Sequence, residues 1–140
     1  MAEVFLDTAY AIALASKADQ HHAMAVELAE ELKAAGTMLV TTQAVVLEIG
    51  NALSMKRRRH AAVQLFDVLS SDPQVEVVSL SEQLMRQSLQ LFRDRPDKDW
   101  GLTDCLSFIV MEQRGIALAL TTDVHFQQAG FEAMMRTRMP

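Results

Sequence analysis

The sequence carries four acidic side chains that border apolar segments and that together could bind a divalent cation. Asp7 closes the apolar run "VFL", and Asp123 follows "LALTT". Asp104 precedes the apolar stretch "CLSFIVM", and Glu48 lies inside "AVVLEIGNAL". Clustered carboxylates repel one another, which raises their pKa values and opposes folding unless a cation compensates them. Mg²⁺ and Mn²⁺ prefer such oxygen ligands, and a cation that is also open to water supports phosphodiester hydrolysis.

Each of these acids also has an ordinary structural explanation when it is considered singly. Asp7 and Asp123 could cap the helices that begin directly after them. Asp104 could complement the dipole of its own helix, and Glu48 could be a flank residue beside an apolar stripe. Three of the four acids border buried segments, however, and this shared position favours a common site over four unrelated roles.

Short apolar runs alternate along the chain with longer segments of helical periodicity. Strands are predicted at residues 3–7, 37–41, 75–80, 117–122 and, as a candidate fifth, 131–136. Helices are predicted at residues 8–17, 20–36, 42–58, 60–71, 82–95 and 103–114. Strands that are separated by helices pair in parallel, with helices on both faces of the sheet. We therefore expect a three-layer α/β/α fold with a central, mostly parallel sheet of four or five strands.

Such a fold would bring the four acids to one edge of the sheet. Ligands of open α/β sheets bind at the carboxyl ends of the strands. Asp7 and Asp123 follow two predicted strands, and Asp104 begins the helix that leads into the fourth. Glu48 lies in the helix after the second strand. The sequence therefore predicts that all four acids are metal ligands and catalytic residues for Mg²⁺ or Mn²⁺.

Composition limits the remaining classes of function. The chain has 140 residues, half of them apolar, which fits one domain over residues 1–140. The net charge of -5 means that nucleic-acid binding needs a local basic patch. Cys105 is the single cysteine, so no internal disulfide is expected. No run reaches the roughly 18–20 apolar residues of a membrane span, and no basic segment precedes the first apolar run. We expect a cytoplasmic protein that does not associate with membranes.

The segment "MKRRRH" is the one dense basic run of the chain. It contains Lys56, Arg57, Arg58 and Arg59. One interpretation is that these four cations contact RNA phosphates. The other is that they form a solvated helix end, where cations suit the dipole of a helix C-terminus. Both interpretations remain open at this point.

The loop before Asp104 offers a second group of polar and aromatic side chains. Arg93, Arg95 and Lys98 form a second candidate edge for RNA. Trp100 could stack on a base, although a structural role is the stronger expectation. His125 follows Asp123 by two residues and either touches the substrate or packs beside the site.

Four stretches resemble the acidic motifs of the PIN-domain ribonucleases, a family that includes the VapC-type toxins of bacterial toxin–antitoxin pairs. They are "VFLDTAY", "VVLEIGNAL", "GLTDCLSFIVM" and "LTTDVHFQQAGF", and they extend over essentially the whole chain. The resemblance places the acids of the family on Asp7, Glu48, Asp104 and Asp123. The small hydroxyl residue that the family has two positions before its last acid falls on Thr121, and its frequent asparagine falls on Asn51.

The resemblance implies a Mg²⁺- or Mn²⁺-dependent endoribonuclease that cuts single-stranded or structured RNA. Members often form homodimers, and many are silenced by an antitoxin encoded beside them. A catalytically weak domain that binds RNA or a partner protein is the alternative from another class. A phosphatase with an aspartyl nucleophile is set aside, because the second carboxylate expected two residues after Asp7 is replaced by Ala9. Metal-dependent cleavage that disappears in an Asp7→Asn variant would decide between nuclease and binding domain.

Overall fold

Helices and strands alternate along almost the whole chain. The computed structural model describes residues 2–139, within which five strands and eight helices form. The strands are β1 (Glu3–Leu6), β2 (Met38–Thr42), β3 (Val75–Val78), β4 (Leu118–Leu120) and β5 (Glu132–Ala133). The helices are α1 (Thr8–Ala15), α2 (His22–Ala34), α3 (Gln43–Ala52), α4 (Lys56–Ser71), α5 (Glu82–Asp94), α6 (Leu102–Arg114), α7 (Val124–Gln128) and α8 (Met134–Thr137).

The five strands form one sheet in the order β3-β2-β1-β4-β5, and every neighbouring pair is parallel. The prediction of a central parallel sheet is therefore confirmed, with the candidate fifth strand included. That strand is shorter than the predicted 131–136, because α8 begins at Met134. Since all strands run in one direction, all of their carboxyl ends lie at the same edge of the sheet.

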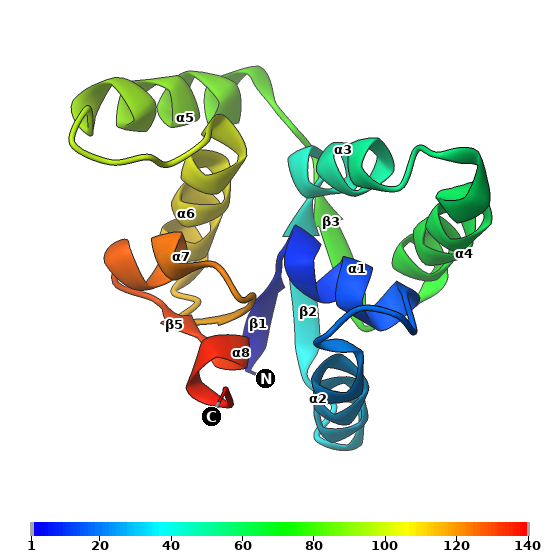
Figure 1. Cartoon of the computed structure of the whole chain (residues 1–140). Coiled ribbons are helices and arrows are strands. Elements are labelled where there is room, and N and C mark those ends of the chain that lie inside the picture. Colours follow the sequence, from blue (N-terminus) through cyan, green and yellow to red (C-terminus); the bar gives the residue numbers. More distant parts are fainter. Residues whose placement is uncertain (1, 140) are drawn as a thin grey trace.

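Helices cover both faces of the sheet, as predicted. Figure 1 shows α1 to α4 on one side of the sheet and α5, α6 and α7 on the other. The chain steps outward from β1 through β2 to β3 and then returns across the sheet to β4 on the far side of β1. The segments after β1 and β4 consequently leave toward opposite faces. Ligands of α/β proteins bind in the crevice at such a switch point, here between β1 and β4.

The core supports the start of α6, which carries one of the predicted ligands. As the apolar sequence predicts, one face of α6 is buried, with Cys105 fully covered. Phe108 of the same helix packs edge-on against both Trp100 and Phe126, with ring centroids 5.0 and 4.9 Å apart. Burial of an aromatic cluster of this kind contributes several kcal/mol, on the order of 1.5–3 kcal/mol for each ring. It fixes the loop before α6 against α7, and Trp100 is therefore a structural residue.

One predicted helix is wrong: residues 42–58 do not form a single helix. α3 ends at Ala52, and α4 begins at Lys56. The buried positions of this region are Val45, Ile49 and Leu53 before the break and Ala62, Leu65 and Leu69 after it. At about 100° per residue, a continuous helix would direct these two apolar stripes to roughly opposite sides. The break lets both stripes face the same core.

None of the helices described between residues 2 and 139 is long and apolar enough to cross a membrane.

Candidate active site

Asp7 lies at the carboxyl end of β1, in the crevice between β1 and β4. The residue is 6% exposed, and its backbone N–H donates to the Leu120 carbonyl of β4 at 3.2 Å. Asp7 occupies the N-cap position of α1, but its carboxylate makes no capping hydrogen bond. The capping explanation for Asp7 is therefore wrong. The carboxylate instead accepts a hydrogen bond from Thr121 Oγ1 at 2.7 Å.

Thr121 links the segments that follow β1 and β4. Its fully buried hydroxyl donates to Oδ2 of Asp7 and accepts the backbone N–H of Asp123 at 3.0 Å. One side chain thus fixes the orientation of the first predicted ligand and the backbone of the last. A serine could supply the same bonds, whereas a valine of equal shape would leave the Asp7 oxygen without this donor.

Glu48 reaches the site from α3, on one face of the sheet. Its Oε1 accepts a hydrogen bond from Thr8 Oγ1 at 2.5 Å, and Thr8 directly follows Asp7. Glu48 and Asn51 line a hollow of about 240 Å³, whose far wall includes Thr103 of α6. Asn51 is exposed, and no hydrogen bond joins its amide to the four acids within residues 2–139. The structure therefore brings Glu48 toward Asp7 and leaves Asn51 at the rim.

Asp104 and Asp123 are joined by His125. The Nδ1 atom of His125 lies 2.9 Å from Oδ2 of Asp104 and 3.4 Å from Oδ1 of Asp123. Asp123 also caps α7 through the His125 backbone N–H at 2.9 Å, so its capping explanation holds in part. Asp104 accepts the Gly101 backbone N–H at 3.2 Å. Both carboxylates are mostly covered, with side chains 18% and 34% exposed.

Burial makes Asp7 a weak acid in the absence of a cation. Desolvation is the main cause, and it raises the pKa of Asp7 from 3.8 to about 7. The hydrogen bond from Thr121 lowers this pKa, while the charges of Asp104 and Glu48 raise it. The charges of both acids therefore act on the pKa of Asp7, although neither acid is hydrogen-bonded to it.

The surroundings of two further groups of the site raise their pKa values. Burial raises the pKa of Asp104, with a contribution from the charge of Asp123, and the hydrogen bond to His125 opposes it. Desolvation lowers the pKa of His125, but the Asp104 hydrogen bond and the charges of Asp123, Asp104 and Asp99 outweigh it, so the net shift is upward. The imidazole is thus held in a strongly negative environment.

The donor set of this crevice fits a hard divalent cation. One atom each of Asp104, Asp123 and His125 can be chosen so that all three lie within 4.8 Å of one another. Asp7 joins them through Thr121, and burial, with smaller contributions from the charges of Asp104 and Glu48, raises the pKa of its carboxyl. Carboxylate oxygens at the open end of a sheet are the ligands that Mg²⁺ and Mn²⁺ prefer.

The basic run lies in the first turn of α4, not at the end of a helix. Lys56, Arg57 and Arg59 are exposed, and Arg58 is partly covered. Cations at a helix N-terminus oppose the helix dipole. The explanation by a favourable C-terminal dipole is therefore wrong. Figure 1 shows the start of α4 beyond the outer end of α3, the helix of Glu48.

Comparison with known proteins identifies the family of this chain. A family model described as PIN domain matches residues 4–132. The chain belongs to the PIN domain family. The 23S rRNA-specific endonuclease VapC20 of Mycobacterium tuberculosis, from two strains, is 27% identical over 128 residues. That alignment covers 91% of this chain and 95% of the relative.

Two solved structures share the architecture of this chain. The crystal structure of M. tuberculosis VapC20, described as a sarcin-ricin loop cleaving toxin, matches with a TM-score of 0.81 and 26% identity. The match covers 93% of this chain and 97% of that one. VapBC2 from Rickettsia felis, bound to a DNA fragment from its promoter, matches with a TM-score of 0.67. At 16% identity over 91% of this chain and 92% of that one, the second likeness shows the fold alone.

The sequence interpretation of this PIN domain missed two polar contacts. Thr8 was not among the candidate site residues, yet it is the hydrogen-bond donor to Glu48. Both interpretations of His125 placed it beside the site, but neither predicted that its imidazole lies between the carboxylates of Asp104 and Asp123. The spacing Asp123-x-His125 suits only the capping bond from the His125 backbone N–H to Asp123, while the contact of the imidazole with Asp104 depends on tertiary structure.

Proposed function

We propose that this protein is a Mg²⁺- or Mn²⁺-dependent endoribonuclease, with residues 1–140 acting as one nuclease domain. Two links in the crevice between β1 and β4 of a PIN domain carry the proposal. Thr121 joins the Asp7 carboxylate to the backbone of Asp123, and His125 lies between Asp104 and Asp123. The relatives named above as an endonuclease specific for 23S rRNA and as a sarcin-ricin loop cleaving toxin support RNA as the substrate.

Each residue of the crevice has a separate task in this proposal. Asp7, Asp104 and Asp123 hold the cation, and Glu48 completes the ligand set from α3. The bound cation would polarise the scissile phosphate, activate water and stabilise the leaving oxygen. Thr121 fixes Oδ2 of Asp7, so that the carboxylate keeps one orientation when it is ionised. His125 keeps Asp104 and Asp123 side by side, because its Nδ1 atom lies against both carboxylates.

The basic first turn of α4 supports an RNA path along α3. Lys56, Arg57, Arg58 and Arg59 give a net acidic protein one local concentration of positive charge. Phosphates that contact these four cations would be fixed in register, while cleavage takes place at the acids. A bound phosphate backbone would also offset the unfavourable interaction between these cations and the helix dipole.

Regulation is proposed from the relatives. VapC20 is described as a toxin, and the Rickettsia structure contains VapBC2 with promoter DNA. We therefore propose that this protein is the toxin of a toxin–antitoxin pair, acts in the cytoplasm and forms a homodimer. Co-expression with the protein encoded by the neighbouring reading frame should suppress cleavage and yield a complex on gel filtration.

Incubation with total RNA tests the proposed activity. Wild-type protein should cut RNA at mapped positions in Mn²⁺ or Mg²⁺ and should leave it intact in EDTA. Asp104→Asn, with near-identical shape and one charge less, should leave it intact in both. Binding of RNA without any metal-dependent cut by the wild type would instead favour the alternative, a catalytically weak binding domain.

A further inference from the structure

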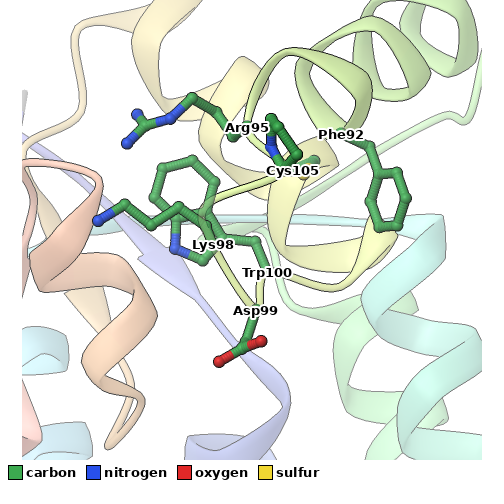
Figure 2. A pocket seen from close by; sticks show the side chains of 7 residues that line it. Phe92, Arg95, Lys98, Asp99, Trp100 and Cys105 are labelled. Atoms are coloured by element: carbon green, nitrogen blue, oxygen red, sulfur yellow. The ribbon is translucent and has the colours of Figure 1, made fainter.

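A cavity of about 430 Å³ lies beside the acids, where α5 ends and α6 begins. Its volume falls in the range of about 300–1,000 Å³ that is typical of small-molecule sites. Figure 2 shows its lining side chains, which come from the last turn of α5, the following loop and the start of α6. One of them, Cys105, directly follows Asp104 in the chain, so the cavity and the acids share the first turn of α6.

The cavity is lined by an exposed aromatic ring, by an arginine that is held in place by its neighbours and by a lysine without an ion pair among residues 2–139. Phe92 is 50% exposed, so its ring is open to contact with a ligand. Arg95 is fixed, because it bonds Asp97 at 3.0 Å and lies 5.0 Å from the centre of the Trp100 ring. Lys98 forms no ion pair with any residue between 2 and 139.

The wall of the cavity is also hydrogen-bonded to α7, the helix that follows Asp123. The Trp100 Nε1–H donates to Oε1 of Gln128 in α7, the helix that Asp123 caps, at 3.0 Å. Asp99 lines the cavity, five residues before Asp104 in the chain. A group bound in the cavity would therefore lie against the first turn of α6, which carries Asp104.

We propose that this cavity binds an unpaired guanine base of the RNA next to the cleavage position. The proposal rests on the endoribonuclease function and adds a specificity site to it. Phe92 stacks on the base, as exposed aromatic side chains do in single-stranded RNA recognition. Lys98 contacts the adjoining phosphate as a point charge.

Asp99 selects guanine among the four bases. A carboxylate can only accept hydrogen bonds, so it selects a base edge that carries donors. Guanine offers two adjacent donors, N1–H and an N–H of its exocyclic amine, which match the two oxygens of one carboxylate. Adenine and cytosine offer a single exocyclic amine beside an acceptor, and uracil offers one N–H between two acceptors. Hydrogen bonds to a carboxylate are also about twice as strong as neutral ones, which sharpens the preference.

Fluorescence anisotropy with labelled single-stranded RNA tests the proposal. Oligouridylates that carry one central guanosine, inosine, adenosine or uridine are titrated in EDTA, where cleavage is absent. The guanosine oligomer should bind best, and inosine, which lacks the exocyclic amine, should bind less well. Phe92→Leu should weaken binding of the guanosine oligomer by roughly 5- to 150-fold, the factor that corresponds to loss of one base–aromatic stack. Phe92→Trp should retain it.

Two further variants separate charge from base recognition. Lys98→Ala should weaken all four oligomers alike and reduce the salt dependence of binding. Asp99→Asn should remove the preference for guanosine, because an amide presents one donor and one acceptor. Arg86→Ala is the control, since Arg86 is an exposed cation of the same helix α5 and is paired with Glu82 away from the cavity.

The outcomes distinguish this proposal from the proposed function. Each oligomer is also incubated with Mn²⁺, and the products are separated. If the wild type neither binds nor cuts any RNA, the proposed function fails, and this inference fails with it. If the wild type cuts RNA but Phe92→Leu and Asp99→Asn bind all four oligomers as the wild type does, the cavity is not a base site. Equal binding of all four oligomers by the wild type overturns the assignment to guanine.

Discussion

Replacing Asp7 by Asn should stabilise the metal-free protein while removing its activity. The pKa of Asp7 is about 7 in the folded protein because the carboxyl is buried, against 3.8 for the ordinary group. Between these two values the folded state holds a proton that the unfolded state has lost. The free energy of unfolding therefore falls as the pH rises through this window. The penalty is absent below pH 3.8 and complete above pH 7.

The size of this effect follows from the two pKa values. A difference of about three pKa units corresponds to roughly 4 kcal/mol over the whole window, at about 1.36 kcal/mol for each unit. Between about pH 5 and pH 8 the same relation gives a loss of about 2–3 kcal/mol. This is a large share of a total stability of about 5–15 kcal/mol. The asparagine that replaces Asp7 cannot ionise, and its amide oxygen can still accept the Thr121 hydrogen bond.

Urea unfolding in EDTA at pH 5 and pH 8 measures this difference. The wild type should lose about 2–3 kcal/mol more than Asp7→Asn does between the two pH values. Comparison of the two proteins cancels the titration of Asp104 and His125 as long as those groups keep their surroundings. Equal losses for both proteins would mean that Asp7 is an ordinary acid, and the electrostatic account of the crevice would be wrong.

Three other perturbations test separate parts of the site. Mn²⁺ at a hundredfold excess over its Kd should stabilise the wild type by about 2.7 kcal/mol and raise its Tm by several degrees in a thermal melt. Asp104→Asn should show a much smaller rise in Tm. If Mn²⁺ does not change the Tm of the wild type, the acids do not form a metal site. The combined change of Arg57, Arg58 and Arg59 to Ala should weaken RNA binding and reduce the slope of log K against log salt by about 2, because each lost phosphate contact accounts for about 0.7. An unchanged slope in a filter-binding titration would mean that these arginines face solvent or bind a protein partner instead of RNA. Glu48→Asp keeps the charge but shortens the reach from α3, so cleavage should fall on the order of 10²-fold while circular dichroism stays the same; near wild-type initial rates would make Glu48 a flank residue.

The strand ends and their acids could be predicted because the physical signal is local. Asp7 and Asp123 each follow a short apolar run, and a parallel sheet brings such ends together whatever the details of packing. Asp104 was predictable for a related reason, since it is the single acid in the first turn of a buried helix. The order of strands was not predictable, because it depends on which face each helix covers.

The break between α3 and α4 could not be predicted from local pattern. Every residue from 42 to 58 except Gly50 is compatible with a helix, and no proline interrupts the segment. The decisive constraint is that the stripe ending at Leu53 and the stripe containing Leu65 must face one core, which is a tertiary requirement. The hydrogen bonds of Thr8 and His125 could not be predicted for the same reason, because their partners lie 40 and 21 residues away in the chain.

Single-turnover cleavage of a mapped RNA by the wild type and by Asp7→Asn tests the central claim most directly. The claim is that the buried carboxylate of Asp7 is kept, at a cost in stability, because it binds the catalytic cation. In Mn²⁺ at pH 8 the wild type should cut the RNA, and Asp7→Asn should cut none although it unfolds at a higher urea concentration in EDTA. Cleavage by Asp7→Asn at the wild-type rate would contradict the four-acid site.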